Sequence, residues 1–309
     1  MPFFEEVDSD GIVEQHIQSV LRLEQDQALQ ILSEYRGIRQ QLIDRLSHIP
    51  AGTFTSQHLR GVLAQVEGAT IAITESLGGA MRDGAEIAAR AGVDDLVTEL
   101  QKFDGMFTGA VTPININAAL IAHDTSTLLV SKYQTNLDLY GQGLLTQISN
   151  GLFSASLGEA SYSEVVGRIS QFFTAEEWKL HRIVRTELHG IYNRGKLAGM
   201  TDLVEDDIPD LKKTLMHPMD SRTGDDSIYA AQLGLVAEVN EPFVYSWGKK
   251  ERVFFAPPDR PNDRAIMVPY REEWGNTGKG AFVPLTQKAS VASWPKSVSK
   301  FLWGASELI

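Results

Sequence analysis

The sequence predicts an α+β fold: an elongated, mainly α-helical N-terminal half, a small antiparallel-sheet α+β unit and an extended C-terminal arm. Apolar residues recur every three or four positions through the first half, which is typical of amphipathic helices. After Asp202 they alternate in short runs, as in strands, and beyond Trp274 the chain is rich in Gly, Ser, Lys and Pro. We therefore expect a helical domain at 1–160, an α+β domain at 161–274 and an arm at 275–309.

The helical half contains three predicted long helices. The first runs from Ile12 to about His48, where a Pro-Ala-Gly break follows at 50–52. The second begins near Ser56 and keeps the helical period to Met81. Its interspersed Gly and Ala residues allow another helix to approach closely, at some cost in helix propensity. A third helix is expected over about 118–152.

Two capping boxes predict two further helices, near 162–173 and 175–201. In a capping box a hydroxyl and a carboxylate three residues later satisfy free N–H groups at a helix start. The two boxes are Ser161 with Glu164 and Thr174 with Glu177. The sequence therefore predicts a helix boundary close to Thr174.

Short alternating segments then predict a small antiparallel sheet packed on the 175–201 helix. One strand is expected at 211–216, and two more at 242–247 and 252–256 are joined by a turn at Gly248. The proline-braced segment that follows cannot enter a central strand before Pro261, because proline lacks an N–H donor.

Composition limits the classes of function. The chain has 309 residues, 43% of them apolar, which is enough for a sizeable core, and no cysteine, which excludes disulfides and thiolate-bound metals. The net charge of -12 disfavours non-specific binding to DNA phosphates. No apolar run has the ~18–20 residues that a membrane helix needs, and the acidic N-terminus lacks the basic residues with which a secretion signal starts. We expect a newly made protein that is soluble and intracellular.

Three polar blocks are the most informative feature of the chain. The first lies on the predicted 175–201 helix, the second opens the sheet unit and the third closes it. The blocks are Arg185-Thr186-Glu187 with Asn193, then Asp220-Ser-Arg222-Thr223, then Asn262-Asp-Arg264. In this order they resemble the minor head, or head morphogenesis, proteins of tailed bacteriophages, the Mu F-like family. The resemblance covers roughly residues 160 to 275.

This resemblance implies a structural protein, not an enzyme. It implies a virion location in the capsid interior or near the portal, after synthesis in the host bacterial cytoplasm, with a role in head assembly and in genome packaging or delivery. The portal and the major capsid protein are the implied partners. A homo-oligomer and weak contact with packaged DNA are compatible with it, and no membrane partner is implied.

The chain also departs from the family pattern. Where many relatives have two cysteines beside the closing arginine, Asp263 and Ala265 flank Arg264 here, and Ser227 stands where a histidine is often found. These changes remove the soft ligands that a zinc site needs. We therefore expect no metal.

The residues themselves favour a structural use of the blocks. Arginine is suited to bidentate bonding with carboxylates, so Arg185 is expected to tie its helix to the Asp220 loop; a chemical role for Arg185 or Glu187 is the alternative. The loop resembles a calcium site at first sight, but Arg222 and Gly224 occupy positions that need oxygen ligands. Its Asp and Thr side chains are instead expected to bond loop backbone.

No catalytic, cofactor-binding or metal-binding residue is predicted. The histidines are scattered, and His181 and His189 are expected to be ordinary surface or packing residues. No phosphate-binding loop, nucleophile elbow or zinc-protease motif occurs.

Two other classes of function remain as alternatives. One is an enzyme of the ADP-ribosyltransferase type, since such domains are fused to some family members, although no Ser-x-Ser followed by Glu-x-Glu occurs after residue 200. The other is an internal protein that contacts DNA and leaves the capsid with it. In the arm, Trp294, Phe301 and Trp303 are expected to anchor the protein to a partner, because aromatic residues are frequent binding hot spots.

Overall fold

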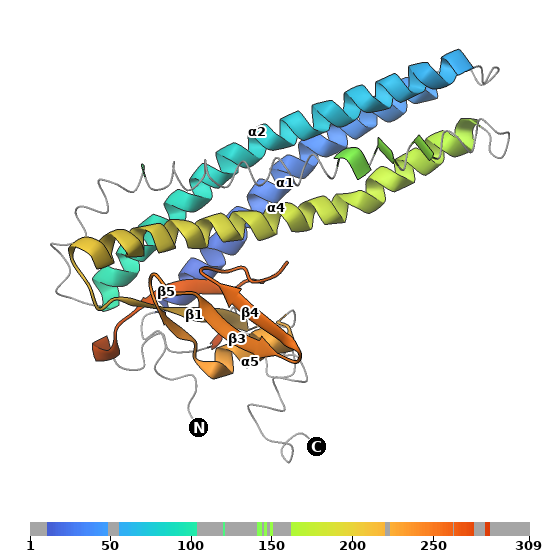
Figure 1. The fold of residues 1–309 in the computed structure, drawn as a ribbon. Coiled ribbons are helices and arrows are strands. Elements are labelled where there is room, and N and C mark those ends of the chain that lie inside the picture. Colours follow the sequence, from blue (N-terminus) through green and yellow to red (C-terminus); the bar gives the residue numbers. More distant parts are fainter. Residues whose placement is uncertain are drawn as a thin grey trace. The chain divides into compact units, whose positions relative to one another are not determined.

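A computed structural model describes most of the predicted helical and sheet regions. The described residues are 11–48, 56–103, 120, 141–143, 145–146, 149–150, 162–219, 223–261, 263–274 and 282–284. Long helices come first and a small sheet follows (Figure 1). The α+β fold class predicted from the sequence is confirmed.

The long helices are α1 (Ile12–Ser47), α2 (Ser56–Phe103) and α4 (Tyr162–Asp206). Helix α1 has the predicted bounds, and its regularly spaced apolar residues are buried. Helix α2 continues beyond Met81 to Phe103, because the apolar period is kept by buried Ala and Val residues such as Ala85, Ala89 and Val93. Most of the helix expected over 118–152 lies outside the described residues.

The predicted helix boundary at Thr174 is wrong, because α4 runs through it without a break. The Thr174 hydroxyl donates to the Ser170 carbonyl within the helix, at 3.0 Å, and so caps nothing. The Glu177 carboxylate accepts instead from the guanidinium of Arg36 on α1. A tertiary ion pair therefore uses the group that the capping box required.

The chain divides into two compact units, and each unit combines distant parts of the sequence. The first comprises Met1–Glu24, Glu86–Ser126 and Thr186–Ile309, and the second comprises Gln25–Ala85 and Thr127–Arg185. In the second unit the Tyr35 hydroxyl donates to the Phe173 carbonyl at 2.8 Å, and the two rings lie 6.0 Å apart. The domain boundaries predicted at 160 and 274 stay predictions.

The first unit contains the sheet. Strand β1 (Lys212–Met219) pairs antiparallel with β2 (Val236–Glu238) and with β5 (Ile266–Tyr270), so the order is β2-β1-β5. Strand β6 (Phe282–Pro284) pairs parallel with the end of β1. Three residues of the predicted arm, 282–284, thus belong to the sheet. The remainder of the arm lies outside the described residues.

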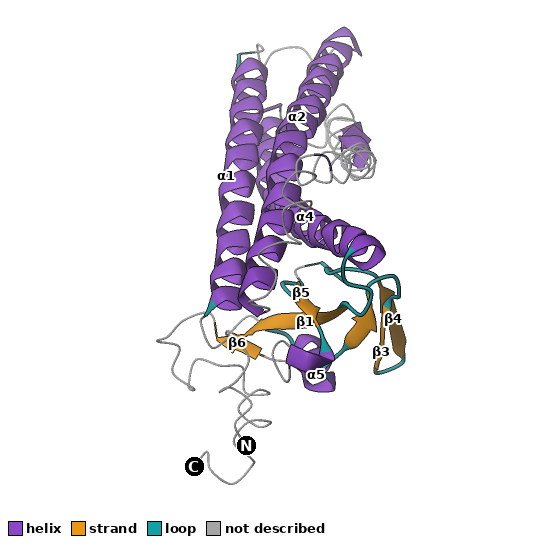
Figure 2. Ribbon diagram, turned by 90° about the vertical axis from the view of Figure 1, so that its left-hand side faces the viewer, coloured by secondary structure: helices purple, strands orange, loops and turns teal. Residues whose placement is uncertain are grey.

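Strands β3 (Phe243–Trp247) and β4 (Lys250–Phe254) form the predicted hairpin as a separate two-stranded sheet. Gly248 occupies its turn with φ +61, a conformation that side chains disfavour. The short helix α5 (Asp225–Leu233), whose first residues the sequence predicts as loop, packs against β1 and β3 (Figure 2). Its start at Gly224 carries no side-chain cap, so the sequence signal for a helix was absent.

The core of the first unit joins α2, α4 and the sheet. Its members share near-complete burial: Val93, Leu96, Val97, Leu100, Met200, Leu203, Ile208, Leu211, Leu215, Val239, Phe243 and Met267. The predicted packing of the sheet on the α4 helix is confirmed. No described helix is apolar enough along a sufficient length to cross a membrane.

Helices α2 and α4 touch backbone to backbone in this unit. A Cβ atom on Gly92 of α2 would lie 2.1 Å from the carbonyl oxygen of Tyr192, and one on Gly195 of α4 would lie 2.3 Å from that of Ala89. Such distances are far inside van der Waals contact, so only glycine fits at both positions.

Candidate functional site

Asn193 of the first polar block ties α4 to the edge of β5. Its side-chain oxygen accepts from the Met267 N–H at 2.7 Å, while its amide nitrogen donates to the Ala265 carbonyl at 3.4 Å and to the His189 carbonyl at 3.0 Å. Asn193 is fully buried. The amide therefore forms hydrogen bonds with the backbone of residues 265 and 267 in place of a neighbouring strand. Strand β5 is the edge of the β2-β1-β5 sheet on this side.

His189, one turn earlier on α4, holds the same segment. Its Nε2 lies 2.6 Å from the Ala265 carbonyl oxygen, and its Nδ1 lies 2.6 Å from Oε1 of Glu24 on α1. Both side chains are buried. Burial lowers the pKa of His189, but the Glu24 carboxylate, the carbonyl and the nearby Asp263 together raise it above its ordinary value. The expectation that His189 is an ordinary surface or packing residue did not include these two polar contacts.

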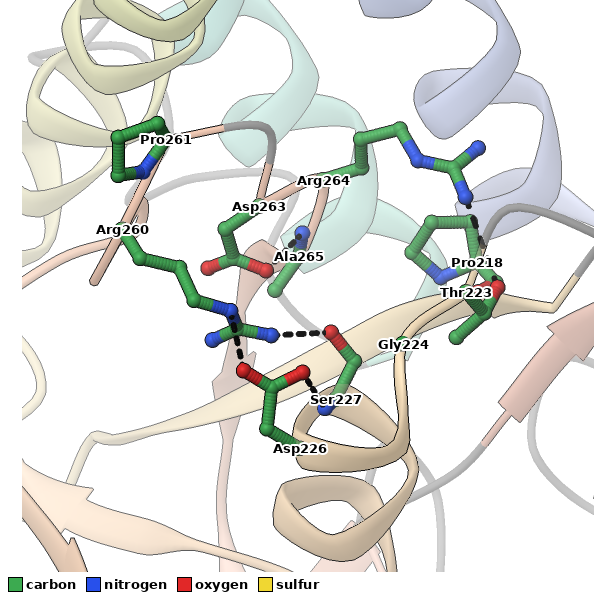
Figure 3. A pocket seen from close by; sticks show the side chains of 10 residues that line it. All are labelled: Pro218, Thr223, Gly224, Asp226, Ser227, Arg260, Pro261, Asp263, Arg264 and Ala265. Carbon is green, nitrogen blue, oxygen red and sulfur yellow. Dashed lines mark hydrogen bonds and ion pairs between the residues drawn. The ribbon is translucent and has the colours of Figure 1, made fainter. Parts of the chain in front are cut away.

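A polar pocket of about 180 Å³ lies where the second and third blocks meet (Figure 3). Its wall comes from the end of β1, the start of α5 and the segment before β5. The lining residues are Pro218, Thr223, Gly224, Asp226, Ser227, Arg260, Pro261, Asp263, Arg264 and Ala265.

Arg260 braces this pocket. Its Nε lies 2.7 Å from Oδ2 of Asp226, and its two other nitrogens donate to Asp259 and to the hydroxyl of Ser227. Figure 3 shows the pairs with Asp226 and Ser227 across the lower wall. Because Asp259 also accepts from the Tyr245 hydroxyl at 2.7 Å, the network continues into the β3–β4 hairpin. The guanidinium thus connects α5 to the hairpin and is used as a structural brace.

Thr223 and Arg264, one from each block, meet at the opposite wall. The Thr223 hydroxyl donates to the Pro218 carbonyl at 2.8 Å, a backbone bond of the kind the sequence predicts for this loop. The Arg264 guanidinium makes a long contact of 3.5 Å to the same hydroxyl. Asp220, Arg222 and Asn262 lie outside the described residues, so the expected pair of Arg185 with Asp220 stays a prediction.

Asp263, which lines the pocket, and His217 of β1 are both buried and interact electrostatically. The Asp263 carboxylate accepts from the backbone N–H groups of Asp259 and Ala265, each at 3.3 Å. Burial raises the pKa of Asp263, but His217, Arg260 and His189 outweigh it, so the net pKa is lowered. His217 in β1 is 2% exposed, and neither ring nitrogen has a hydrogen-bond partner among the described residues. Burial lowers its pKa to about 4, so it is neutral at pH 7.

The triplet Arg185-Thr186-Glu187 lies on α4, and all three side chains are half-buried and interact with neighbouring groups. Arg185 lies one turn from His181, and its charge together with burial lowers the pKa of that histidine. Trp294, Phe301 and Trp303 lie outside the described residues.

Sequence reasoning missed a charged cluster buried between the long helices of the first unit. Glu99 of α2 accepts from Lys196 Nζ of α4 at 2.5 Å and lies 2.8 Å from Nδ1 of His16 of α1. Asp95, one turn before Glu99, accepts from the Tyr192 hydroxyl at 2.7 Å. Burial raises the pKa of Asp95, and the charge of His16 opposes the rise. The available signal was the position of Glu99 between Leu96 and Leu100, on the apolar face of α2.

No group of three or more His, Asp or Glu side chains that could hold a metal ion occurs among the described residues. Comparison with protein-family models, with curated proteins and with solved structures finds no match. The chemistry of the site must therefore be argued from its own contacts, most of which join one element of the first unit to another.

Proposed function

We propose that the protein is a structural minor head protein of a tailed phage, docked in or under the capsid near the portal, where it assists head assembly and genome packaging or delivery. The motif order in the sequence suggests this family. The observation that carries the proposal is that described residues of all three blocks act on one short segment. Asn193 binds the backbone on either side of Ile266, and Arg264, two residues before Ile266, contacts Thr223.

The use of the polar groups supports a structural role. The nitrogens of Arg260 contact Asp226, Asp259 and Ser227, and the Thr223 hydroxyl is donated to a backbone carbonyl. A catalytic arginine or hydroxyl must instead be available to a substrate in its reacting geometry. The blocks resemble braces that hold a small domain closed.

The exposed apolar side chains of the hairpin support docking to other proteins. Val244 and Val253 form a cross-strand pair, and both are at least 50% exposed, as is Phe255 just after β4. Residues of this kind are stabilised when a partner covers them. Together with the aromatic residues of the arm they give the protein more than one apolar element with which to contact the portal or capsid.

Particles of the phage or prophage that encodes the chain provide the test. We expect an epitope-tagged protein to co-purify with heads at a fixed small number of copies, and cryo-EM of the particles to place it beside the portal or the inner capsid surface. Heads that contain none of the protein in spite of its normal expression would contradict the proposal.

The arm is tested by deleting residues 290–309. We expect the truncated protein to be missing from heads while its helicity and melting curve match those of the full chain, because the Gly, Ser and Lys content of the arm offers little apolar area for a core. Deleting residues 1–8, at the opposite terminus, provides a control. We expect this second truncated protein to be incorporated into heads normally. Normal incorporation of the 290–309 deletion would show that the arm is not a docking element.

The same particles separate the alternatives. A protein that contacts DNA and leaves with it should be present in full heads, absent from emptied ones, and should bind duplex DNA with a steep salt dependence. An ADP-ribosyltransferase should transfer label from labelled NAD to host or virion proteins.

A further inference from the structure

The contacts of His189 require a proton that joins α4 to α1. The Ala265 carbonyl has only lone pairs, so Nε2, at 2.6 Å, must carry a hydrogen. Nδ1 lies 2.6 Å from Glu24 Oε1, and this second contact also needs one proton between its two atoms. The ring and the carboxylate therefore share a proton in a buried pair, with side chains 1% and 2% exposed.

The charged groups around His189 favour keeping that proton on the ring. Glu24 faces it from α1, and Asp263 faces it from the segment that precedes β5. His217 of β1 also interacts with Asp263, but burial lowers the pKa of His217 to about 4, so it is neutral at pH 7. His189 thus lies between two carboxylates, and Arg260 also acts on the second of them, Asp263.

We propose that His189 is a proton-operated latch for residues 263–265: the doubly protonated ring clamps this segment to α4, and loss of its Nδ1 proton releases the clamp. With that proton gone, a ring lone pair and a carboxylate lie 2.6 Å apart, and both side chains are buried. Two acceptors repel at this distance, so the ring must turn, and turning also breaks the Nε2 bond to Ala265.

The released segment is a wall of the polar pocket, since Asp263, Arg264 and Ala265 all line it. Asn193 carries no titratable group and keeps its 2.7 Å bond to Met267, so β5 stays in place; its contact with the Ala265 carbonyl is long, at 3.4 Å, and holds residue 265 only weakly. The latch therefore acts on the pocket wall and leaves the sheet intact. Alkaline pH opens this wall and neutral or acidic pH closes it, because the charge-assisted bond is present only in the protonated form.

The direct measurement is the ¹⁵N spectrum of the His189 ring in the full-length protein between pH 6 and pH 10. We expect both ring nitrogens to be protonated at pH 7, and a single transition at a pH above the ordinary histidine value. Over the same transition, hydrogen exchange should show about a tenfold or greater loss of protection for the amides of 263–265, after correction for intrinsic exchange, while the amides of 267–268 stay protected.

Two variants complete the experiment. His189→Gln cannot carry the charge, so its protection at 263–265 should be low and independent of the pH transition. His16→Gln is the matched control, because His16 also contacts buried carboxylates but does not touch the segment; it should keep the wild-type transition. A neutral His189 ring at pH 7 in the wild-type protein, or protection at 263–265 that does not change when the ring titrates, would overturn the proposal. Both are measured on the wild-type chain, so they decide the matter even if a variant does not fold.

Discussion

Replacing Asn193 with leucine tests whether the first polar block holds the sheet. The two side chains have the same number and branching of heavy atoms, but leucine removes the acceptor of the Met267 N–H, which is bonded at 2.7 Å and belongs to a residue that is 0% exposed. A buried N–H without a partner costs about 1–3 kcal/mol. The Ala265 carbonyl keeps its bond from His189, so no second group is stranded. We therefore expect Asn193→Leu to lower the free energy of unfolding by about 1–3 kcal/mol.

Urea denaturation followed by circular dichroism and by tryptophan fluorescence measures this loss. The neighbouring exposed residue provides the control: Arg194→Ala should stay within about 0.5 kcal/mol of the wild type. Hydrogen exchange should locate the effect of Asn193→Leu in β5. If Asn193→Leu is as stable as Arg194→Ala, the amide does not act as a substitute strand and the argument fails.

Three further predictions follow from the buried charges and the ligand chemistry. Lys196→Met should destabilise the protein by about 3–5 kcal/mol, because the buried Glu99 carboxylate loses its ammonium partner and keeps only the contact with His16 described above. Lys196→Met combined with Glu99→Leu should recover much of the loss, and equal instability of both variants in a thermal melt would refute this. As pH falls from 6.5 to 4, His217 takes up a proton in the unfolded chain before it does so in the folded chain. The wild type should therefore lose up to about 3 kcal/mol of unfolding free energy over this range, whereas His217→Leu should not. Parallel plots of unfolding free energy against pH for the two proteins would contradict this. Elemental analysis should find less than one zinc per chain, and a chelator should leave the circular dichroism unchanged; zinc at one per chain and unfolding by chelator would refute the absence of a metal site.

The sequence predicted well those elements in which local pattern and tertiary structure agree. Helix α1 and strand β1 follow their apolar periods, and the hairpin follows from alternating residues around Gly248. At Thr174 the local signal and the structure disagree: the capping box was complete, but the Glu177 carboxylate binds Arg36, a residue 141 positions away. A local sequence motif does not show whether a distant residue will bind the carboxylate that the cap requires.

The sequence indicated which segments form the candidate site, but it did not indicate which residues contact one another there. Asn193 and Thr223 belong to the blocks, whereas His189 and Lys196 were passed over because a single histidine or lysine on a helix is usually exposed. Their partners, Glu24 and Glu99, come from other helices, far along the chain. Helix α5 was missed since Gly224 offers no side chain as a cap.

The reciprocal glycines at the α2–α4 crossing have a consequence for recognising distant relatives of this chain. Apolar core positions tolerate exchange among Leu, Ile, Val and Met, so they fade quickly as sequences diverge. Gly92 and Gly195 have no such alternatives, because even an alanine would place its Cβ 2.1 Å and 2.3 Å from a backbone carbonyl oxygen. Each glycine is also followed at a fixed interval by a member of the buried ion pair: Glu99 comes seven residues after Gly92, and Lys196 directly follows Gly195. We therefore expect that a search for Gly-x₆-Glu on one helix and Gly-Lys on a later helix can identify relatives whose overall sequence similarity to this chain is no longer detectable.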